Sequence, residues 1–178
     1  MSRARRESPS AIAVELSVVE RMLLSRLLEQ LIEVLADRTD PAMGRLLPNA
    51  YPDDAESAAE FYRFTADGLT ERKVAGARAV LAAISGDTTG SPAAQHATQP
   101  GAHHPAEHDA AQQPVVLVEP APVQWLHALT DLRLTIANRL GIAADGDVGR
   151  TDEDAMPLQH SYYWLGELQE QLVEALES

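Results

Sequence analysis

The sequence predicts an all-α protein, a compact bundle of about five helices with at most a minor two-stranded β-ribbon. Aromatic residues make up only 4% of the 178 residues, so we expect a core of Leu, Ala, Val and Ile. A core of that kind favours helices over a β-sandwich. Apolar residues also recur at helical spacing, with capping residues at the ends of the segments. The length suits a single helical domain, residues 1–178.

The first elements are a short strand and a long helix. Residues 12–16 alternate between apolar and small or polar side chains, a pattern typical of a strand. Ser17 and Glu20 follow at the spacing of a capping box, which predicts a helix over residues 18–37. Its apolar positions are Val19, Met22, Leu23, Leu24, Leu27, Leu28, Leu31, Ile32 and Leu35. A face that wide packs against at least two neighbours, so we expect this helix at the centre.

A connector and two helices are expected next. Residues 44–54 contain two prolines, which restrict the backbone and predict an ordered connector. Asp53 or Asp54 caps the following helix, which extends to about residue 64. Another helix begins at Thr65 or Asp67 and reaches residue 84.

Two polar stretches are expected to be disordered. Residues 85–113 form an Ala/His/Pro-rich linker without periodicity, which buries too little apolar surface to offset its ordering entropy. The basic N-terminus, residues 1–10, is expected to be solvated and disordered. A phosphate contact by its three arginines is the alternative. Residues 115–118 are rich in valine and can pair with residues 12–16 to make the ribbon.

The C-terminal third predicts two more helices. The first covers residues 122–140 and ends at Gly141, because glycine readily adopts the left-handed conformation that ends a helix. An acidic loop covers residues 143–156. The closing helix then covers residues 157–176 and turns Leu165, Leu168, Leu172, Val173 and Leu176 inward.

Most residue patterns that carry enzyme chemistry are missing. The chain has no cysteine, which excludes disulfides, thiolate catalysis, iron–sulfur clusters and cysteine zinc sites. The motifs of P-loop, dinucleotide-binding, serine-hydrolase and zinc-protease sites do not occur. The linker histidines have no spacing that places three around one ion: His96, His103, His104 and His108. We therefore expect a protein without enzymatic activity, cofactor or metal.

The charge points towards protein partners. A formal net charge of −13 disfavours non-specific binding to DNA or RNA, because a polyanion repels an acidic surface. No segment resembles a signal peptide, and no apolar stretch is long enough to span a bilayer. We therefore expect a cytoplasmic protein that contacts other proteins. A homodimer through an apolar face of residues 18–37 or 158–176 is left open.

Arg133 falls on the apolar face of the helix predicted at residues 122–140, where an unpaired charge is costly. Glu60 is the candidate partner, because it flanks Phe61 and Phe64. The alternative is that Arg133 reaches solvent from the rim of that face.

Four glutamates lie three or four residues apart on the closing helix: Glu167, Glu170, Glu174 and Glu177. They predict an acidic ridge beside the apolar face. One interpretation is a solvated helix face. The other is a docking strip for a basic protein surface, where opposite charges steer the encounter.

Three stretches together resemble a known family. They are RLLPNAYPDDAESAAEFYRFT (45–65), WLHALTDLRLTIANRLGI (125–142) and YYWLGELQEQLVEAL (162–176). In this order, with a variable linker after the first, they are similar to the actinobacterial AosR family of oxidative-stress regulators. The likeness covers most of the chain outside the linker. The motif positions are Arg45, Pro48, Tyr51, Pro52, Asp53, Asp54, Glu60, Phe61, Trp125, Asp131, Arg133, Arg139 and Trp164.

The resemblance implies transcription control during oxidative stress, through contact with a stress sigma factor and promoter regions. A thiol-based response cannot operate here, because the chain has no cysteine. Contact with a sigma factor or RNA polymerase suits the charge better than direct binding to promoter DNA. The alternative function is a helical adaptor or scaffold outside transcription, for example in regulated proteolysis.

Overall fold

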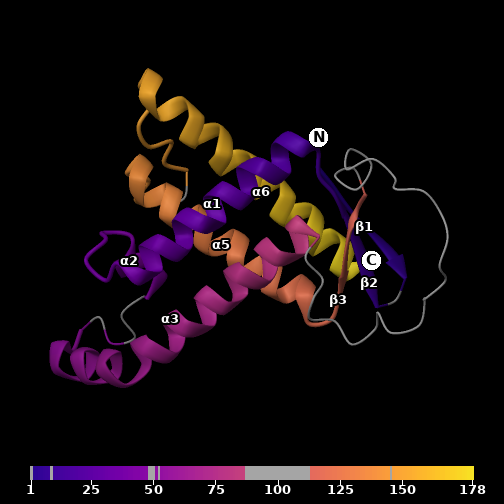
Figure 1. The fold of residues 1–178 in the computed structure, drawn as a ribbon. Coiled ribbons are helices and arrows are strands. Elements are labelled where there is room, and N and C mark those ends of the chain that lie inside the picture. The colour runs from indigo at the N-terminus through magenta and orange to yellow at the C-terminus, as the bar shows by residue number, and fades with distance from the viewer. Residues whose placement is uncertain (1, 9, 48–50, 52, 87–112, 145) are drawn as a thin grey trace.

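Helices dominate the structure, as the spacing of the leucines predicts. The computed structural model describes residues 1–178 except residues 1, 9, 48–50, 52, 87–112 and 145. The helices in the described part are α1 (Val18–Ala36), α2 (Met43–Leu46), α3 (Ala55–Ser85), α5 (Ala121–Leu140) and α6 (Met156–Glu177) (Figure 1). The strands are β1 (Arg3–Ser8), β2 (Ala11–Glu15) and β3 (Val115–Val118), and a short 3-10 helix, η1 (Glu153–Ala155), precedes α6. The mostly helical fold is confirmed.

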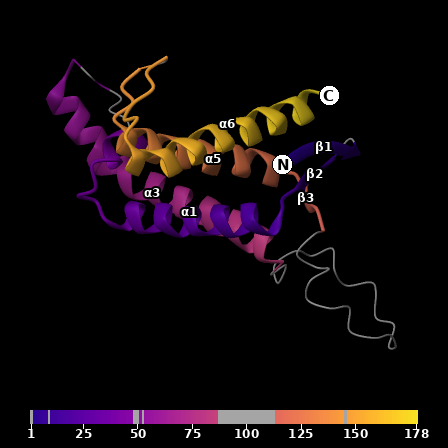
Figure 2. The same ribbon diagram turned by 90° about the horizontal axis from the view of Figure 1, so that it is seen from above.

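The long helices form two layers. Figure 2 shows α1 and α3 in one layer, α5 and α6 in the other, and the sheet at one end. The two layers pack on each other mainly through α3 and α5. The largest fully buried side chains are Trp125, Leu24, Leu28, Leu31, Leu35, Leu46, Leu117, Leu129, Leu140, Leu165, Leu168 and Leu172. Helices α1, α5 and α6 therefore bury leucine-rich faces, whereas α3 buries the smaller side chains of Ala66, Ala77, Val80 and Ile84.

Helix α1 begins at the predicted capping box. The Ser17 hydroxyl accepts the Glu20 N–H at 3.3 Å, and the Glu20 carboxylate accepts the Ser17 N–H at 2.8 Å. The helix packs against both α3 and α5, as its wide apolar face predicts. Val19 and Met22 are nevertheless exposed. The buried face is therefore narrower in the first turns than the sequence predicts.

The sheet has three antiparallel strands, in the order β1-β2-β3. The predicted pairing of β2 with β3 is confirmed. Strand β1 adds to the other edge of β2, so the expectations of a disordered start over residues 1–10 and of a two-stranded ribbon are wrong. Contacts with α6 hold β1 in place: the Ala4 N–H donates to Gln171 Oε1 at 3.0 Å, and the Arg6 guanidinium donates to main-chain carbonyls at the end of α6.

A single helix replaces the two that the sequence predicts after the connector. Helix α3 has 31 residues, and the Asp54 carboxylate caps it by accepting two N–H groups of its first turn. Thr65 lies inside the helix and donates its hydroxyl to the Phe61 carbonyl at 2.7 Å. Asp67 pairs with Arg38, which follows α1. Neither side chain therefore caps a second helix.

Glycines terminate α3 and α5, and a further glycine lets the chain after α5 approach that helix closely. Residues 87–112, most of the predicted linker and all four of its histidines, lie outside the described residues. Gly141 ends α5 in the left-handed conformation, as predicted. The predicted acidic loop ends earlier than expected, because η1 begins at Glu153 and α6 at Met156. Before η1 the chain returns to α5 at Gly149, where an added Cβ would lie 2.6 Å from the Leu140 carbonyl oxygen. Among the described residues, no helix is both long and apolar enough to cross a bilayer.

Candidate functional site

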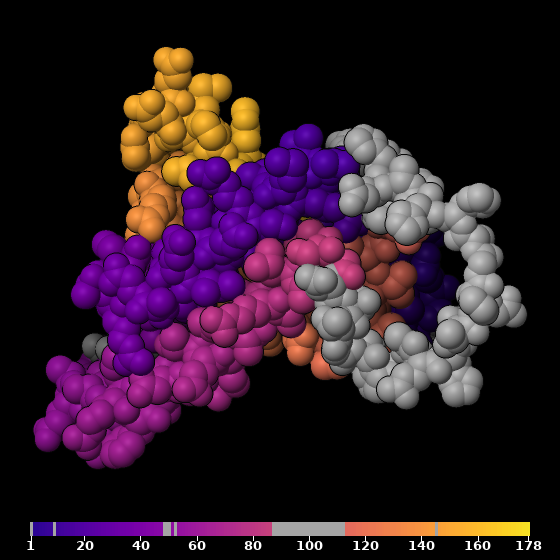
Figure 3. All heavy atoms as spheres, in the orientation of Figure 1, coloured from indigo at the N-terminus to yellow at the C-terminus, as the bar shows by residue number. Residues whose placement is uncertain are grey.

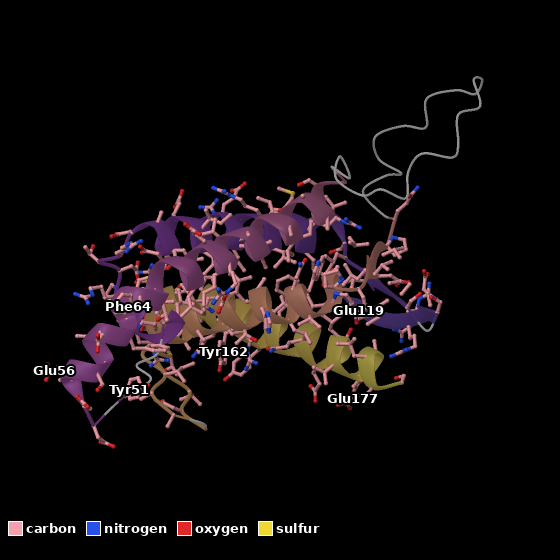
Figure 4. The ribbon with its side chains drawn as sticks, turned by 90° about the horizontal axis from the view of Figure 1, so that it is seen from below. Tyr51, Glu56, Phe64, Glu119, Tyr162 and Glu177 are labelled. Atoms are coloured by element: carbon pink, nitrogen blue, oxygen red, sulfur yellow. The ribbon has the colours of Figure 1, made fainter. Side chains whose placement is uncertain are left out.

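The structure places the four predicted partner-binding glutamates on one exposed face of α6: Glu167, Glu170, Glu174 and Glu177. We call this set the acidic strip. Leu165, Leu168 and Leu172 on the opposite face are fully buried and fix its orientation. In Figure 4, Glu177 lies at the end of α6 near the sheet, and Tyr162 lies further back along the helix. The strip therefore follows the outer side of the α5–α6 layer.

A groove of about 680 Å³ runs beside the acidic strip, between α6 and Arg133 of α5. Three strip glutamates line it together with Tyr162, Tyr163 and Val173. Val173, which the sequence predicts to face the core, is exposed here. Aromatic residues are enriched where proteins contact each other, and a merely solvated helix face needs none. The groove therefore favours the docking interpretation of the strip.

The carboxylates of the acidic strip have no basic partner among the described residues. None of the four forms an ion pair with any described residue. Neighbours three or four positions apart on a helix repel each other when they carry like charges. The last turn of α6 contains no basic residue, so the strip also ends at the negative pole of the helix dipole. We therefore expect the strip to lower the stability of α6.

Arg133 does not pair with Glu60, so that expectation is wrong. Its guanidinium donates to Gln169 Oε1 at 2.9 Å and lies 4.9 Å from the centre of the Tyr162 ring. No carboxylate of a described residue lies within ion-pair distance of it. Glu60 is exposed on the first turns of α3. Arg133 is half-buried, close to the rim position that the sequence leaves as the alternative, and its guanidinium also contacts the face of the Tyr162 ring.

A second groove, of about 570 Å³, lies between α3 and α5 and contains a polar cluster. The ammonium of Lys73, the only lysine of the chain, lies 2.6 Å from Asp131 Oδ1, and His127 lines the same groove. Burial raises the pKa of Asp131, although the hydrogen bond and charge of Lys73 and the charge of His127 lower it. Because Lys73 belongs to α3 and Asp131 to α5, the ion pair joins the two helices.

The sequence does not predict the Lys73–Asp131 pair. At 100° per residue, Asp131 falls about 150° from the centre of the apolar face expected for residues 122–140, so the pattern alone gives no reason to expect a buried carboxylate there. Lysine occurs once in the chain, inside another predicted helix. What the sequence does not supply is the packing of α3 on α5 that brings the two together.

Most of the described motif positions of the first and second stretches stabilise the fold. Arg45 donates to the Ile142 carbonyl, and Arg139 pairs with Asp40 at 2.9 Å. Trp125 is buried, and Asp54 caps α3. Trp164 of the third stretch donates its indole N–H to Ser2 Oγ at 3.1 Å and so ties α6 to the N-terminus. Pro48 and Pro52 lie outside the described residues.

Tyr51 and Phe61 are two motif positions whose aromatic rings do not join the core. Both rings are exposed, and they meet edge to face with their centres 5.8 Å apart. Tyr62 and Phe64 are exposed beside them, and Figure 4 shows Tyr51 and Phe64 at the end of the molecule where α3 begins. We call these four residues the aromatic end of α3. The sequence predicts no role for this group.

The described part of the chain contains no cluster of side chains arranged as a metal site. No group of three or more His, Asp or Glu side chains there is arranged to hold a metal ion. His127 and His160 are both exposed and lie on different helices.

Comparison with known proteins gives a family and nothing finer. No curated protein and no solved structure matches this chain. A family model described as a domain of unknown function, DUF2017, matches residues 1–176. The match covers both layers of helices, the sheet and nearly the whole acidic strip. The chain therefore belongs to the DUF2017 family.

Proposed function

We propose that this protein is an AosR-like regulator of stress-response genes, which acts by contact with a sigma factor or RNA polymerase and without thiol-based sensing. The resemblance of the three sequence stretches supports the role in transcription. The charge of −13 and the surface of α6 support protein contact as its mode of action. Sigma factors and polymerase present basic surfaces to DNA, and an acidic protein complements such surfaces.

The acidic strip is the observation that carries the proposal. Four exposed glutamates without ion pairs repel each other along one helix, at its unfavourable end. Sequences that break a local stability rule without visible compensation do so most often at functional sites. A basic partner would supply the missing counter-charge, and Tyr163 and Val173 would add apolar contact in the adjoining groove.

Direct promoter recognition is not part of the proposal. The purified protein alone is expected to give no shift of promoter DNA at physiological salt, because phosphates repel its net charge. Tight, salt-sensitive binding of promoter DNA by the lone protein would overturn this view.

The test is recovery of partners from the native cell before and after oxidant treatment. The full chain is compared with a strip variant in which all four strip glutamates are changed to glutamine. A matched control carries Glu29→Gln, Glu33→Gln, Glu71→Gln and Glu153→Gln, which removes the same charge from exposed positions elsewhere. We expect the chain and the control to recover polymerase or a sigma factor and the strip variant to lose it.

Two other outcomes contradict the proposal in different ways. Recovery of protease or chaperone subunits in place of polymerase would establish the adaptor alternative. Equal recovery of polymerase by the strip variant and the control would show that α6 is not the contact surface.

A further inference from the structure

The first three turns of α3 bury no side chain. Every residue from Ala55 to Thr65 is exposed or half-buried, and Ala66 is the first buried residue of the helix. Figures 1 and 3 show this end of α3 projecting from one corner of the molecule, at the lower left. Most helical stability in proteins comes from packing an apolar face, so an end of this kind gains little from the fold.

Aromatic side chains gather on this end, although they are scarce in the chain. The exposed fractions are 71% for Phe64, 46% for Tyr51, 45% for Tyr62 and 39% for Phe61. Both phenylalanines and two of the four tyrosines of the chain belong to this group. Exposed apolar clusters mark protein contact sites, and aromatic rings supply much of the binding energy there.

Two local contacts position the aromatic end in the free chain. The Asp54 carboxylate accepts hydrogen bonds from the Ser57 hydroxyl and from the N–H groups of Ser57 and Glu56, which lower its pKa and cap the start of the helix. The Arg63 guanidinium lies 4.9 Å from the centre of the Phe64 ring. Preordering of this kind lowers the entropy that association would otherwise lose.

The charges around the aromatic end identify the chemistry of its partner. Asp53, Glu56 and Glu60 are exposed and form no ion pair with any described residue. Arg63 is the only basic residue between positions 53 and 64, and it already covers Phe64. A second copy of this acidic chain would place like charges against each other, whereas a basic segment complements them.

We infer that the aromatic end of α3 binds a basic amphipathic helix of a partner protein. The apolar face of that helix covers Phe61 and Phe64, and its lysines or arginines meet Glu56 and Glu60. The inference rests on the proposed function for the existence of a basic protein partner. The surface itself is separate from the acidic strip, since it belongs to the first turns of α3.

The phenylalanines offer a direct readout, because the chain has only these two. Biosynthetic fluorophenylalanine gives two fluorine NMR resonances, both from the aromatic end, and a Phe61→Tyr variant assigns them. The labelled full chain is titrated with a helical model peptide of leucine and lysine, and with a counterpart in which glutamate replaces lysine. We expect both resonances to shift with the lysine peptide only, and the affinity to fall by about ten-fold between about 0.05 M and 0.5 M salt.

Variants separate the apolar from the charged part of the contact. Phe61→Ser with Phe64→Ser removes exposed rings, so the fold remains, and binding of a dye-labelled lysine peptide should weaken about ten-fold or more. Val19→Ser with Met22→Ser removes two apolar side chains from α1 that are 74% and 69% exposed, and it should leave binding unchanged. Glu56→Gln with Glu60→Gln should remove most of the salt dependence of the affinity for the lysine peptide. The control Glu29→Gln with Glu33→Gln should leave that salt dependence unchanged.

Three results would overturn the inference. They are no shift with the lysine peptide, an equal shift with the glutamate peptide, or a shift with protein concentration alone, which would identify a second copy as the occupant. Each leaves the dependence of polymerase recovery on the acidic strip intact. Conversely, if the strip variant recovered as much polymerase as the wild type, the expected titration of the labelled chain with the lysine peptide would not change. The two proposals can therefore be refuted separately.

Discussion

The ion pair between Lys73 and Asp131 gives the sharpest prediction about stability. The Asp131 side chain is 6% exposed and that of Lys73 is 23% exposed. Lys73→Met removes the counter-charge and leaves a buried carboxylate. Breaking a fully buried pair from one side costs about 3–5 kcal/mol, and the partly solvated amine of Lys73 reduces this to about 2–4 kcal/mol at neutral pH.

The loss should depend on pH in a defined direction. The pKa of Asp131 is raised in the folded chain, so the native state binds the proton more tightly than the unfolded state. Stability from this group is therefore present at low pH and is lost as the pH rises through the folded pKa. Removing Lys73 raises that pKa further, so Lys73→Met should regain stability as the pH falls from about 7.5 to about 5.5.

Chemical denaturation followed by circular dichroism and by the fluorescence of Trp125 and Trp164 measures these effects. The control is the double variant Lys73→Met with Asp131→Leu, which removes both charges and should lie within about 1 kcal/mol of the wild type. A Lys73→Met variant as stable as the wild type at neutral pH, or a loss that does not change with pH, would refute the reasoning.

Three more predictions concern the core, a loop and the acidic strip. Leu165→Ala should lower the free energy of unfolding by about 2–5 kcal/mol, because this side chain is fully buried. The control Val173→Ala, at an exposed site on the same helix, should lower it by well under about 1 kcal/mol. Gly149→Ala should lower the free energy of unfolding by about 1–3 kcal/mol, because the residue has a positive φ and a Cβ would meet the Leu140 carbonyl. An unchanged denaturation midpoint would contradict this. The strip variant should be more stable than wild type by about 1 kcal/mol at low salt, since it removes three like-charge neighbours. A salt-independent or lower stability would show that the strip costs its helix nothing.

Local patterns carried the successful predictions about the fold. The capping box at Ser17 and Glu20 depends on residues three positions apart, and both hydrogen bonds are present. Gly141 at the end of α5 is also a local signal, because only the backbone conformation of one residue is involved. The acidic strip is likewise a local pattern: helical spacing alone places its four members on one face.

Contacts between distant segments account for the errors. The arginines near the N-terminus predict a solvated, disordered segment. In the structure, Arg6 donates hydrogen bonds to carbonyls at the end of α6, some 170 positions away. The sequence predicts Thr65 or Asp67 as a helix cap. It does not show that Asp67 forms an ion pair with Arg38. Arg133 was assigned the wrong partner for the same reason, since Gln169 reaches it only through the packing of α5 on α6.

Binding of the purified protein to purified RNA polymerase and stress sigma factor is the most direct test of the central claim. The wild type, the strip variant and its matched control are compared at about 0.05 M and 0.3 M salt. The account predicts a dissociation constant that rises about ten-fold or more in the strip variant at low salt and little in the control. Identical affinities of the strip variant and the wild type, or no binding of either, would contradict it.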